Sequence, residues 1–300
     1  MKHAQRPLAD RIAQVRATKE KWIRYAIGEK AVQILEDRLL DPPTTRMHGV
    51  AIIAETNSGK TTIAERFLRR HPAEIHIAKP SIVPVLKVEA TRADEDRFYN
   101  KILEELPVFK TGMSARTSQK EVAVLRALRD CSVKMLIIDE FHNLVRATPG
   151  KQRDFLIVLK TLANELRITL VVIGLPEVYN ALQADRQIAN RLPYVIFLPK
   201  WQLDQPNKPD EPSEYRKFLA AFGLLLPFDE PLELGDNPMA AAIFELSEGT
   251  IGEATDLIRL ASEHVLKAGR EHMTVKDLSS CGYVPPSRRA FPPDLGVASA

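Results

Sequence analysis

Two short segments carry side chains suited to phosphate chemistry. The first, AETNSGKTT (54–62), lies between an apolar run and a helical pattern. At such a strand-to-helix turn, backbone N–H groups and the helix dipole both favour a phosphate. Gly59 allows close backbone approach, Lys60 can reach the terminal phosphates, and Thr61 can offer its hydroxyl to Mg²⁺. The usual first glycine is replaced by Ala54, which fits if that residue keeps a negative φ.

The second segment, VKMLIIDEFHNL (133–144), runs from four apolar residues into two adjacent carboxylates. In such a motif Asp139 holds the Mg²⁺ shell and Glu140 acts as general base for a water that attacks the γ-phosphate. Together the two segments predict a site for ATP and Mg²⁺, with Thr61 and Asp139 at the metal. The predicted nucleotide-binding residues are Glu55, Thr56, Asn57, Ser58, Gly59, Lys60, Thr61 and Thr62.

Two further positions bear on hydrolysis. The strand ITLVVIGLPE ends in Gly174 and Leu175, so it offers no polar side chain to orient the attacking water. We therefore expect slow or partner-stimulated hydrolysis. Before the last strand lie Arg186 and Arg191, of which Arg191 is the better candidate to act in trans on a neighbouring subunit's γ-phosphate. The alternative for each is a surface arginine at a helix end.

The elements that must position these residues follow from the hydrophobic pattern. Continuous apolar runs at 49–54, 82–88, 133–139, 168–174 and 194–198 alternate with helical patterns near 60–71, 94–106, 118–130 and 151–166. Apolar strands without alternation indicate a parallel sheet that is buried on both faces. We predict an α/β fold with helices on both faces of that sheet.

The flanking regions are predicted to be helical. Apolar residues recur at helical spacing from Leu8 to about Leu40, and 204–214 is a polar, proline-bearing boundary. The predicted parts are a helical extension (1–45), a P-loop domain (46–203), an all-α lid (204–283) and a flexible tail (284–300).

Composition narrows the class of protein. The chain is 45% hydrophobic and 27% charged, its net charge is +3, and no apolar run reaches the length of a membrane span. Cys131 and Cys281 form no C-x-x-C motif. We expect a cytoplasmic protein with free thiols and no membrane partner. The basic excess in residues 1–30 suits nucleic acid, an acidic protein face or simply a solvated helix.

The ordered set AETNSGKTT, LIIDEFHNL, VVIGLPE and ANRL, followed by an all-helical lid, resembles an AAA+ ATPase. RYAIGEKAVQILEDRLLDPPTTRMHGVAIIAETNSGKTT, LPKWQLDQP and LSEGTIGEATDLIRLA narrow this to the transposition ATPases TniB and TnsC, with MuB more distant. The resemblance covers about residues 20–275. One departure is in the lid, where many AAA+ proteins have an arginine beside the position of Gly252. Here Glu253 lies beside it, and Arg259 is two turns further on.

The resemblance implies an ATPase that oligomerises on double-stranded DNA as a ring or helical filament. It also implies delivery of target DNA to a DDE-type transposase, with ATP hydrolysis regulating disassembly. Such a filament needs basic and hydroxyl side chains that contact phosphates. Two loops, 109–121 and 145–154, offer them. The candidate DNA contacts are Lys110, Thr111, Arg116, Arg146 and Lys151.

Two alternatives remain open from the sequence. An AAA+ helicase loader or replication initiator would share every residue of the nucleotide site and would differ in its partner. A structural adaptor with an inactive P-loop would differ in having no ATP turnover.

Overall fold

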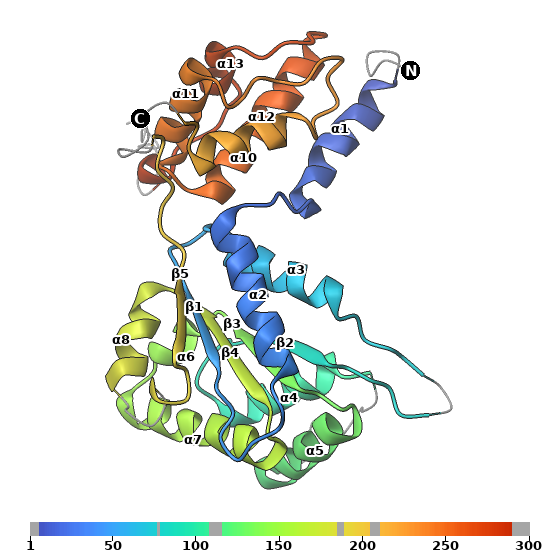
Figure 1. Ribbon diagram of the computed structural model, residues 1–300, viewed down its shortest axis with the longest axis vertical. Helices are drawn as coiled ribbons and strands as arrows, with labels where there is room; N and C mark the ends of the chain where they lie inside the picture. The colour runs from blue at the N-terminus through green and yellow to red at the C-terminus, as the bar shows by residue number, and fades with distance from the viewer. Residues whose placement is uncertain (1–5, 77–78, 108–115, 185–188, 205–210, 290–300) are drawn as a thin grey trace, which may run out of the picture. The chain divides into compact units, whose positions relative to one another are not determined.

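The computed structural model describes residues 6–76, 79–107, 116–184, 189–204 and 211–289. Contacts divide the chain into two compact units, which are described separately (Figure 1). The sheet unit comprises residues 27–56 and 60–199. The helical unit comprises residues 1–26, 57–59 and 200–300. The boundaries expected from sequence fall elsewhere, at 45/46 and 203/204.

The sheet unit is built on five parallel strands in the order β2-β3-β4-β1-β5. These are β1 (Val50–Ile53), β2 (Val85–Glu89), β3 (Met135–Asp139), β4 (Thr169–Gly174) and β5 (Tyr194–Phe197). Every residue of the three central strands is buried, whereas β2 and β5 at the edges are partly exposed. Burial on both faces explains why the central strands read as unbroken apolar runs.

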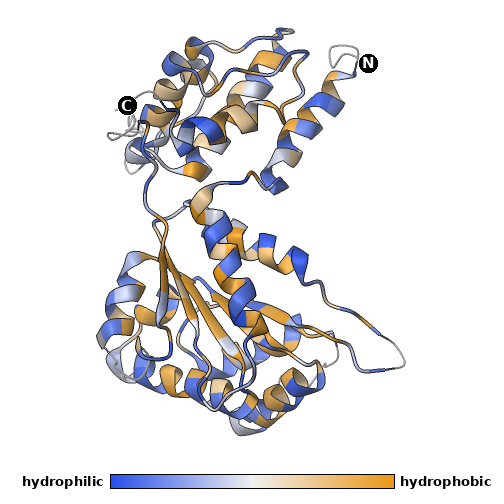
Figure 2. Cartoon of the chain, in the orientation of Figure 1, coloured by the Kyte–Doolittle hydropathy of each residue, from blue (hydrophilic) through white to orange (hydrophobic). Residues whose placement is uncertain are grey.

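Helices cover both faces of this sheet. One face packs in a continuous apolar core against α4 (Glu95–Glu105), α5 (Thr117–Asp130), α7 (Pro149–Leu166) and α8 (Pro176–Ala184). Helices α2 (Ala26–Leu40) and α3 (Lys60–Arg70) lie together on the other face (Figure 1), where Glu36 forms an ion pair with Arg70 and lies 2.7 Å from His71 Nε2. Figure 2 shows apolar strands and helices that are polar on their outer sides. The predicted α/β architecture is confirmed.

Strand register brings the chemistry to one edge of the sheet. Glu89 pairs with Asp139, and Ile53 pairs with Gly174, so four strands end side by side. The short helix α6 (His142–Val145) follows β3 directly, and Phe141 N–H donates to Ile173 O at 2.8 Å. Residues that follow these strands therefore gather at the carboxyl edge.

The helical unit contains α10 (Glu214–Gly223), α11 (Asn237–Ser247), α12 (Ile251–Lys267) and α13 (Val275–Ser280). Its core also takes Val15 from α1 (Leu8–Ala17), the first helix of the chain. Two bidentate ion pairs join α1 to the rest of the unit: Arg11 to Glu271, between α12 and α13, at 2.7 and 2.6 Å, and Arg16 to Glu263 of α12 at 2.8 and 3.0 Å. Two basic residues of the N-terminus are thus already paired with carboxylates.

The N-terminal helical pattern is interrupted in the structure. After α1 and a short 3₁₀ turn (Thr18–Glu20), the chain leaves helical conformation before α2 starts at Ala26. The aromatic side chain of Tyr25 lies 5.3 Å from Trp201 and 6.4 Å from Phe218, measured between ring centroids. Aromatic packing of this kind outweighs local helical periodicity. No helix among the described residues is both long and apolar enough to cross a membrane.

Candidate nucleotide site

The predicted phosphate loop lies between β1 and α3, as a P-loop requires. Gly59 has φ +84° and Asn57 has φ +57°, so the turn uses left-handed backbone at two positions. Ala54 is buried, donates its N–H to Gly174 O at 3.2 Å, and is not among the residues with positive φ. Its methyl group therefore needs no special backbone conformation, and an alanine fits where other P-loops have glycine.

Lys60 is the first residue of α3 and is only 7% exposed. Its Nζ donates to the loop carbonyls of Ala54, at 2.8 Å, and Glu55, at 2.5 Å. Burial lowers the pKa of Lys60, and the nearby carboxylates of Glu140 and Asp139 oppose that shift. A buried amine held by two weak carbonyl acceptors is suited to a stronger, anionic ligand.

The two residues predicted to hold Mg²⁺ are in direct contact. Thr61 Oγ1 donates to Asp139 Oδ2 at 3.1 Å, and Asp139 is 4% exposed. A hydroxyl and a carboxylate side by side form the oxygen-rich, partly hydrated environment that Mg²⁺ prefers. These residues therefore fit the ion. Lys87 of β2 lies close by, with Nζ 3.8 Å from Asp139 Oδ2 and 2.5 Å from Glu65 Oε1.

Glu140 faces a cavity of about 320 Å³ at this edge. Its backbone has φ +55°, a left-handed conformation that costs a non-glycine residue about 1 kcal/mol or more. Asp139 Oδ1 accepts the Glu140 N–H at 2.9 Å, and Asn143 N–H donates to Glu140 O at 3.0 Å. The cavity is lined by Thr61, Lys87, Glu89, Lys101, Glu105, Asp139 and Glu140.

One side chain at this position was not singled out from the sequence. His142 Nε2 lies 3.2 Å from Glu140 Oε2, and the imidazole is almost fully buried. The sequence DEFH shows the Glu-x-His spacing, but no rule predicts which way a side chain points at a strand-to-helix turn. The left-handed Glu140 is the unpredictable element.

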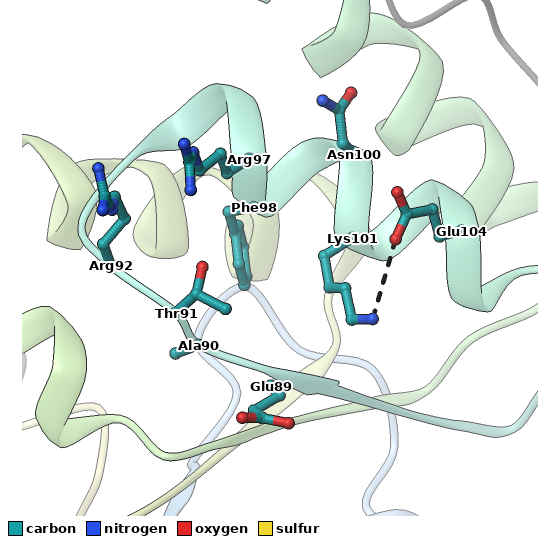
Figure 3. Close-up of a pocket in the computed structure, with 9 residues that line it drawn as sticks. All are labelled: Glu89, Ala90, Thr91, Arg92, Arg97, Phe98, Asn100, Lys101 and Glu104. Carbon is teal, nitrogen blue, oxygen red and sulfur yellow. Dashed lines mark ion pairs between the residues drawn. The ribbon is translucent and has the colours of Figure 1, made fainter.

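A second pocket adjoins the first along β2 and α4. It measures about 230 Å³ and shares Glu89 and Lys101 with the nucleotide cavity. Figure 3 shows Arg92 and Arg97 together at one end and Glu104 at the other, paired with Lys101. Arg92 and Arg97 are exposed cations that are not among the DNA contacts predicted from the sequence.

Arg191 lies at the opposite edge of the sheet. Its carbonyl accepts the N–H of Gly49 at 2.6 Å, which places it beside the amino end of β1. The side chain is half-buried, and Nη1 is shielded from solvent without a hydrogen-bond partner among the described residues. Burial, and then repulsion from Arg46, lower its pKa. Arg191 is thus remote from its own phosphate loop, as an arginine acting in trans must be. Arg186 lies outside the described residues.

The candidate DNA contacts are only partly visible. Lys110 and Thr111 lie outside the described residues. Arg116 precedes α5 and is exposed, and Lys151 is exposed in the first turn of α7. Arg146 is also exposed but pairs with Glu177 at 2.9 Å.

In the helical unit, an arginine does reach the position where the sequence shows none. Arg289 makes two bonds to Glu253, at 2.9 and 2.6 Å, and Tyr283 Oη donates to the same carboxylate at 2.7 Å. Burial raises the pKa of Glu253, but these bonds outweigh it and leave the pKa below its ordinary value. Arg259 instead bonds Asp256. The sequence separation of 36 residues between Arg289 and Glu253 hid this pair.

Solved structures show the same fold. Aeropyrum pernix ORC2 in its ADP form matches with a TM-score of 0.61 at 16% identity, over 85% of this chain and 66% of that one. Aeropyrum pernix ORC1 in complex with DNA matches with 0.60 at 16%, over 90% and 68%. Cdc6p from Pyrobaculum aerophilum matches with 0.61 at 15%, over 86% and 67%. The chain thus spans about two thirds of the length of these proteins.

No curated protein matches the sequence. A family model, described as bacterial TniB protein, matches residues 11–203. That range includes the phosphate loop, the Asp139–Glu140 pair and Arg191, and it covers well over half of the chain. With an AAA+ ATPase fold and this match, the chain belongs to the TniB family.

Proposed function

We propose that this protein is an ATP-dependent, DNA-binding regulator of DNA transposition that acts in the cytoplasm. It assembles on double-stranded DNA as a ring or helical filament and delivers that DNA to a DDE-type transposase. ATP hydrolysis controls assembly and disassembly. Family membership supports the role in transposition. The nucleotide part rests on one observation, the hydrogen bond that joins Thr61 of the P-loop helix to Asp139 of β3.

The residues at the carboxyl edge divide the work of hydrolysis. Lys60 binds the terminal phosphates, exchanging two carbonyl acceptors for charged oxygens. Thr61 and Asp139 would hold Mg²⁺, which would neutralise charge on the phosphate oxygens. Glu140 accepts a proton from water while the water oxygen bonds to the γ-phosphorus. The bond to the β–γ bridging oxygen breaks, its electron pair stays on ADP, and the proton passes on to the released phosphate.

Arg191 acts on the site of a neighbouring subunit. Its place beside the amino end of β1, away from its own P-loop, supports a role that needs a second copy of the chain. Its shielded Nη1, which has no hydrogen-bond partner among the described residues, also supports that role. An arginine aimed at the γ-phosphate from outside can raise the rate by about 10³-fold or more. Hydrolysis then depends on assembly, in keeping with the expected slow turnover of the single chain.

DNA contact uses exposed cations of the sheet unit. Arg116 and Lys151 are exposed and Arg146 is held by one surface carboxylate, and Arg92 and Arg97 extend this basic set beside the second pocket. Lys110 and Thr111 complete the proposed contacts. Because such side chains bind phosphates rather than base edges, binding is sequence-independent and weakens steeply with salt.

Electron microscopy of the full chain with duplex DNA tests the proposal. We expect ordered assemblies with ATP or a slowly hydrolysed analogue and their loss with ADP. Phosphate release, measured in parallel, should require Glu140. Equal assembly with ATP, with ADP and without nucleotide would contradict an ATP-controlled filament.

The fold likeness to ORC and Cdc6 proteins supports a second candidate, a helicase loader or initiator. Both candidates predict the same nucleotide chemistry, so the discriminating observation is the partner. Co-purification with the transposase of the same element supports the first, and co-purification with a replicative helicase supports the second.

A further inference from the structure

The sheet unit lacks a polar side chain where one is expected to assist hydrolysis. β4 ends in Gly174, followed by Leu175, and neither can hydrogen-bond through its side chain. Added bulk at Gly174 would meet Val178 Cγ2 at 2.6 Å and the His142 backbone nitrogen at 3.3 Å. The end of β4 is therefore closed to larger side chains by Val178 of α8 and by the backbone at the start of α6.

His142 brings a polar group to this place from another strand. It is the first residue of α6, directly beyond the β3 carboxylates, and its side chain is 11% exposed. Its Nε2 lies 3.2 Å from Glu140 Oε2. Its Nδ1 is buried and has no hydrogen-bond partner among the described residues. The ring is thus fixed by packing, and its Nε2 faces the carboxylate of Glu140.

The charges around the ring favour this pairing. Glu177 of α8 also acts electrostatically with His142, but it is bonded by Arg146 at 2.9 Å. Glu140 has no such arginine in the described chain. A neutral imidazole that donates through Nε2 can satisfy the Glu140 carboxylate, which leaves Nδ1 as an acceptor.

Glu140 needs such a partner because its backbone alone leaves the carboxylate mobile. The left-handed φ is held by the Asp139 carboxylate and by the turn of α6, but those bonds stop at the main chain. The side chain is 39% exposed and faces the cavity. An imidazole nitrogen held 3.2 Å from Oε2 can restrict its rotamers and keep the other carboxylate oxygen toward the water.

We propose that His142 is a positioning residue that orients the Glu140 carboxylate for water activation, taking the place of the polar group absent from the end of β4. This inference rests on the proposed ATPase function. His142 donates to Oε2 and leaves Oε1 to receive the proton of the attacking water. It contacts neither nucleotide nor water and acts through Glu140 alone.

Kinetics of substituted proteins test this role. His142→Ala should lower single-turnover ATP hydrolysis on duplex DNA about 10- to 100-fold, the usual effect of losing a group that orients a reacting side chain. The Kd for a slowly hydrolysed analogue should change less than twofold. His142→Gln, whose amide can donate, should recover part of the rate. His71→Ala is the matched control, because it removes another His–Glu pair of the same unit, at 2.7 Å from Glu36.

The effect must also depend on Glu140. In a Glu140→Gln background, adding His142→Ala should slow hydrolysis less than threefold further. In nucleotide-free protein, ring ¹⁵N shifts of His142, assigned by their absence in His142→Gln, should show the tautomer protonated at Nε2. That readout needs no turnover, and a ring protonated only at Nδ1 would overturn the pairing.

The outcomes separate the two proposals. If the wild type hydrolyses ATP and His142→Ala is equally fast or faster, the positioning role is wrong and the ATPase stands. A parallel loss of analogue binding in His142→Ala would show a structural role instead. Absence of both analogue binding and hydrolysis in the wild type would overturn the ATPase and this role with it.

Discussion

Charged side chains are held in opposite ways at the carboxyl edge of the sheet and in the helical unit. In the helical unit the Asp277 carboxylate accepts two hydrogen bonds from Arg270 and two from Thr274, and Glu253 and Glu271 each accept two from one arginine. At the sheet edge, within the described part of the chain, the side chain of Lys60 has only loop carbonyls as partners and that of Glu140 only one imidazole. Saturated pairs stabilise a fold, whereas weakly satisfied charges beside a cavity are available to a ligand.

The largest effect should come from the carboxylate at the cavity. Glu140→Gln keeps size and hydrogen bonding but removes the general base, so ATP turnover should fall about 10²- to 10⁴-fold. Binding of a slowly hydrolysed analogue should persist, because the phosphates are held by other residues. Phosphate release and calorimetric binding are the two measurements. Turnover at the wild-type rate would remove Glu140 from the mechanism.

Two buried lysines, Lys60 at the nucleotide site and Lys120 within the fold, should respond differently to substitution. Lys60→Ala should weaken ATP binding at least about 100-fold, since a charge-assisted phosphate contact is worth some 3 kcal/mol in a buried site. Lys120, 2% exposed, donates to Asp96 at 2.7 Å within the fold. Lys120→Ala should lower the thermal unfolding midpoint and leave the ATP Kd nearly unchanged. Equal losses of ATP affinity in both variants would contradict separate roles for Lys60 in ligand binding and Lys120 in stability.

A carboxylate of the helical unit should affect stability rather than binding. Its partners, first of all Arg270, hold the pKa of Asp277 well below the ordinary 3.8. A lowered folded-state pKa means that its stabilisation is present above pH 3.8 and decreases as the pH falls below that value. Asp277→Asn should cost about 2 kcal/mol at pH 7, measured by urea unfolding.

The same pair of proteins should converge in acid, because the wild-type carboxyl is then progressively protonated. Asp256→Asn is the control, since Asp256 is far more exposed and Arg259 is its one ion-pair partner in the part of the chain that the structure describes. A constant difference between wild type and Asp277→Asn from pH 7 to pH 3 would contradict the assigned pKa direction.

The smallest effect concerns DNA. Lys151 is exposed, with no ion pair among the described residues, whereas Arg16 is bound to Glu263. Lys151→Ala should weaken duplex binding a few-fold and reduce the salt slope by about one. Arg16→Ala should leave both unchanged in a fluorescence anisotropy titration. An unchanged slope for Lys151→Ala would remove that residue from the DNA contacts.

Elements that depend on one strong local sequence pattern could be predicted from the sequence. The buried strands are continuous apolar runs, and the P-loop and the Asp139–Glu140 pair keep a fixed order along a parallel sheet, so the Thr61–Asp139 contact was expected. The break before α2 was not expected, because Trp22 fits a helical period and the packing of Tyr25 against Trp201 and Phe218 is not local. The Arg289–Glu253 pair could not be predicted for the same reason. The contact of His142 with Glu140 could not be predicted because it depends on a left-handed φ at Glu140.

The ion pairs of α1 have a consequence for synthesis on the ribosome. Arg11 meets a carboxylate 260 residues later in the chain, and Arg16 one 247 residues later. At about 5–20 residues per second, the first helix waits roughly 12–50 s for these partners. The whole sheet unit emerges in that interval and can fold first. Helix α1, which is made before the sheet unit, is therefore among the last elements to reach its native contacts, and until then its apolar side is exposed to chaperones.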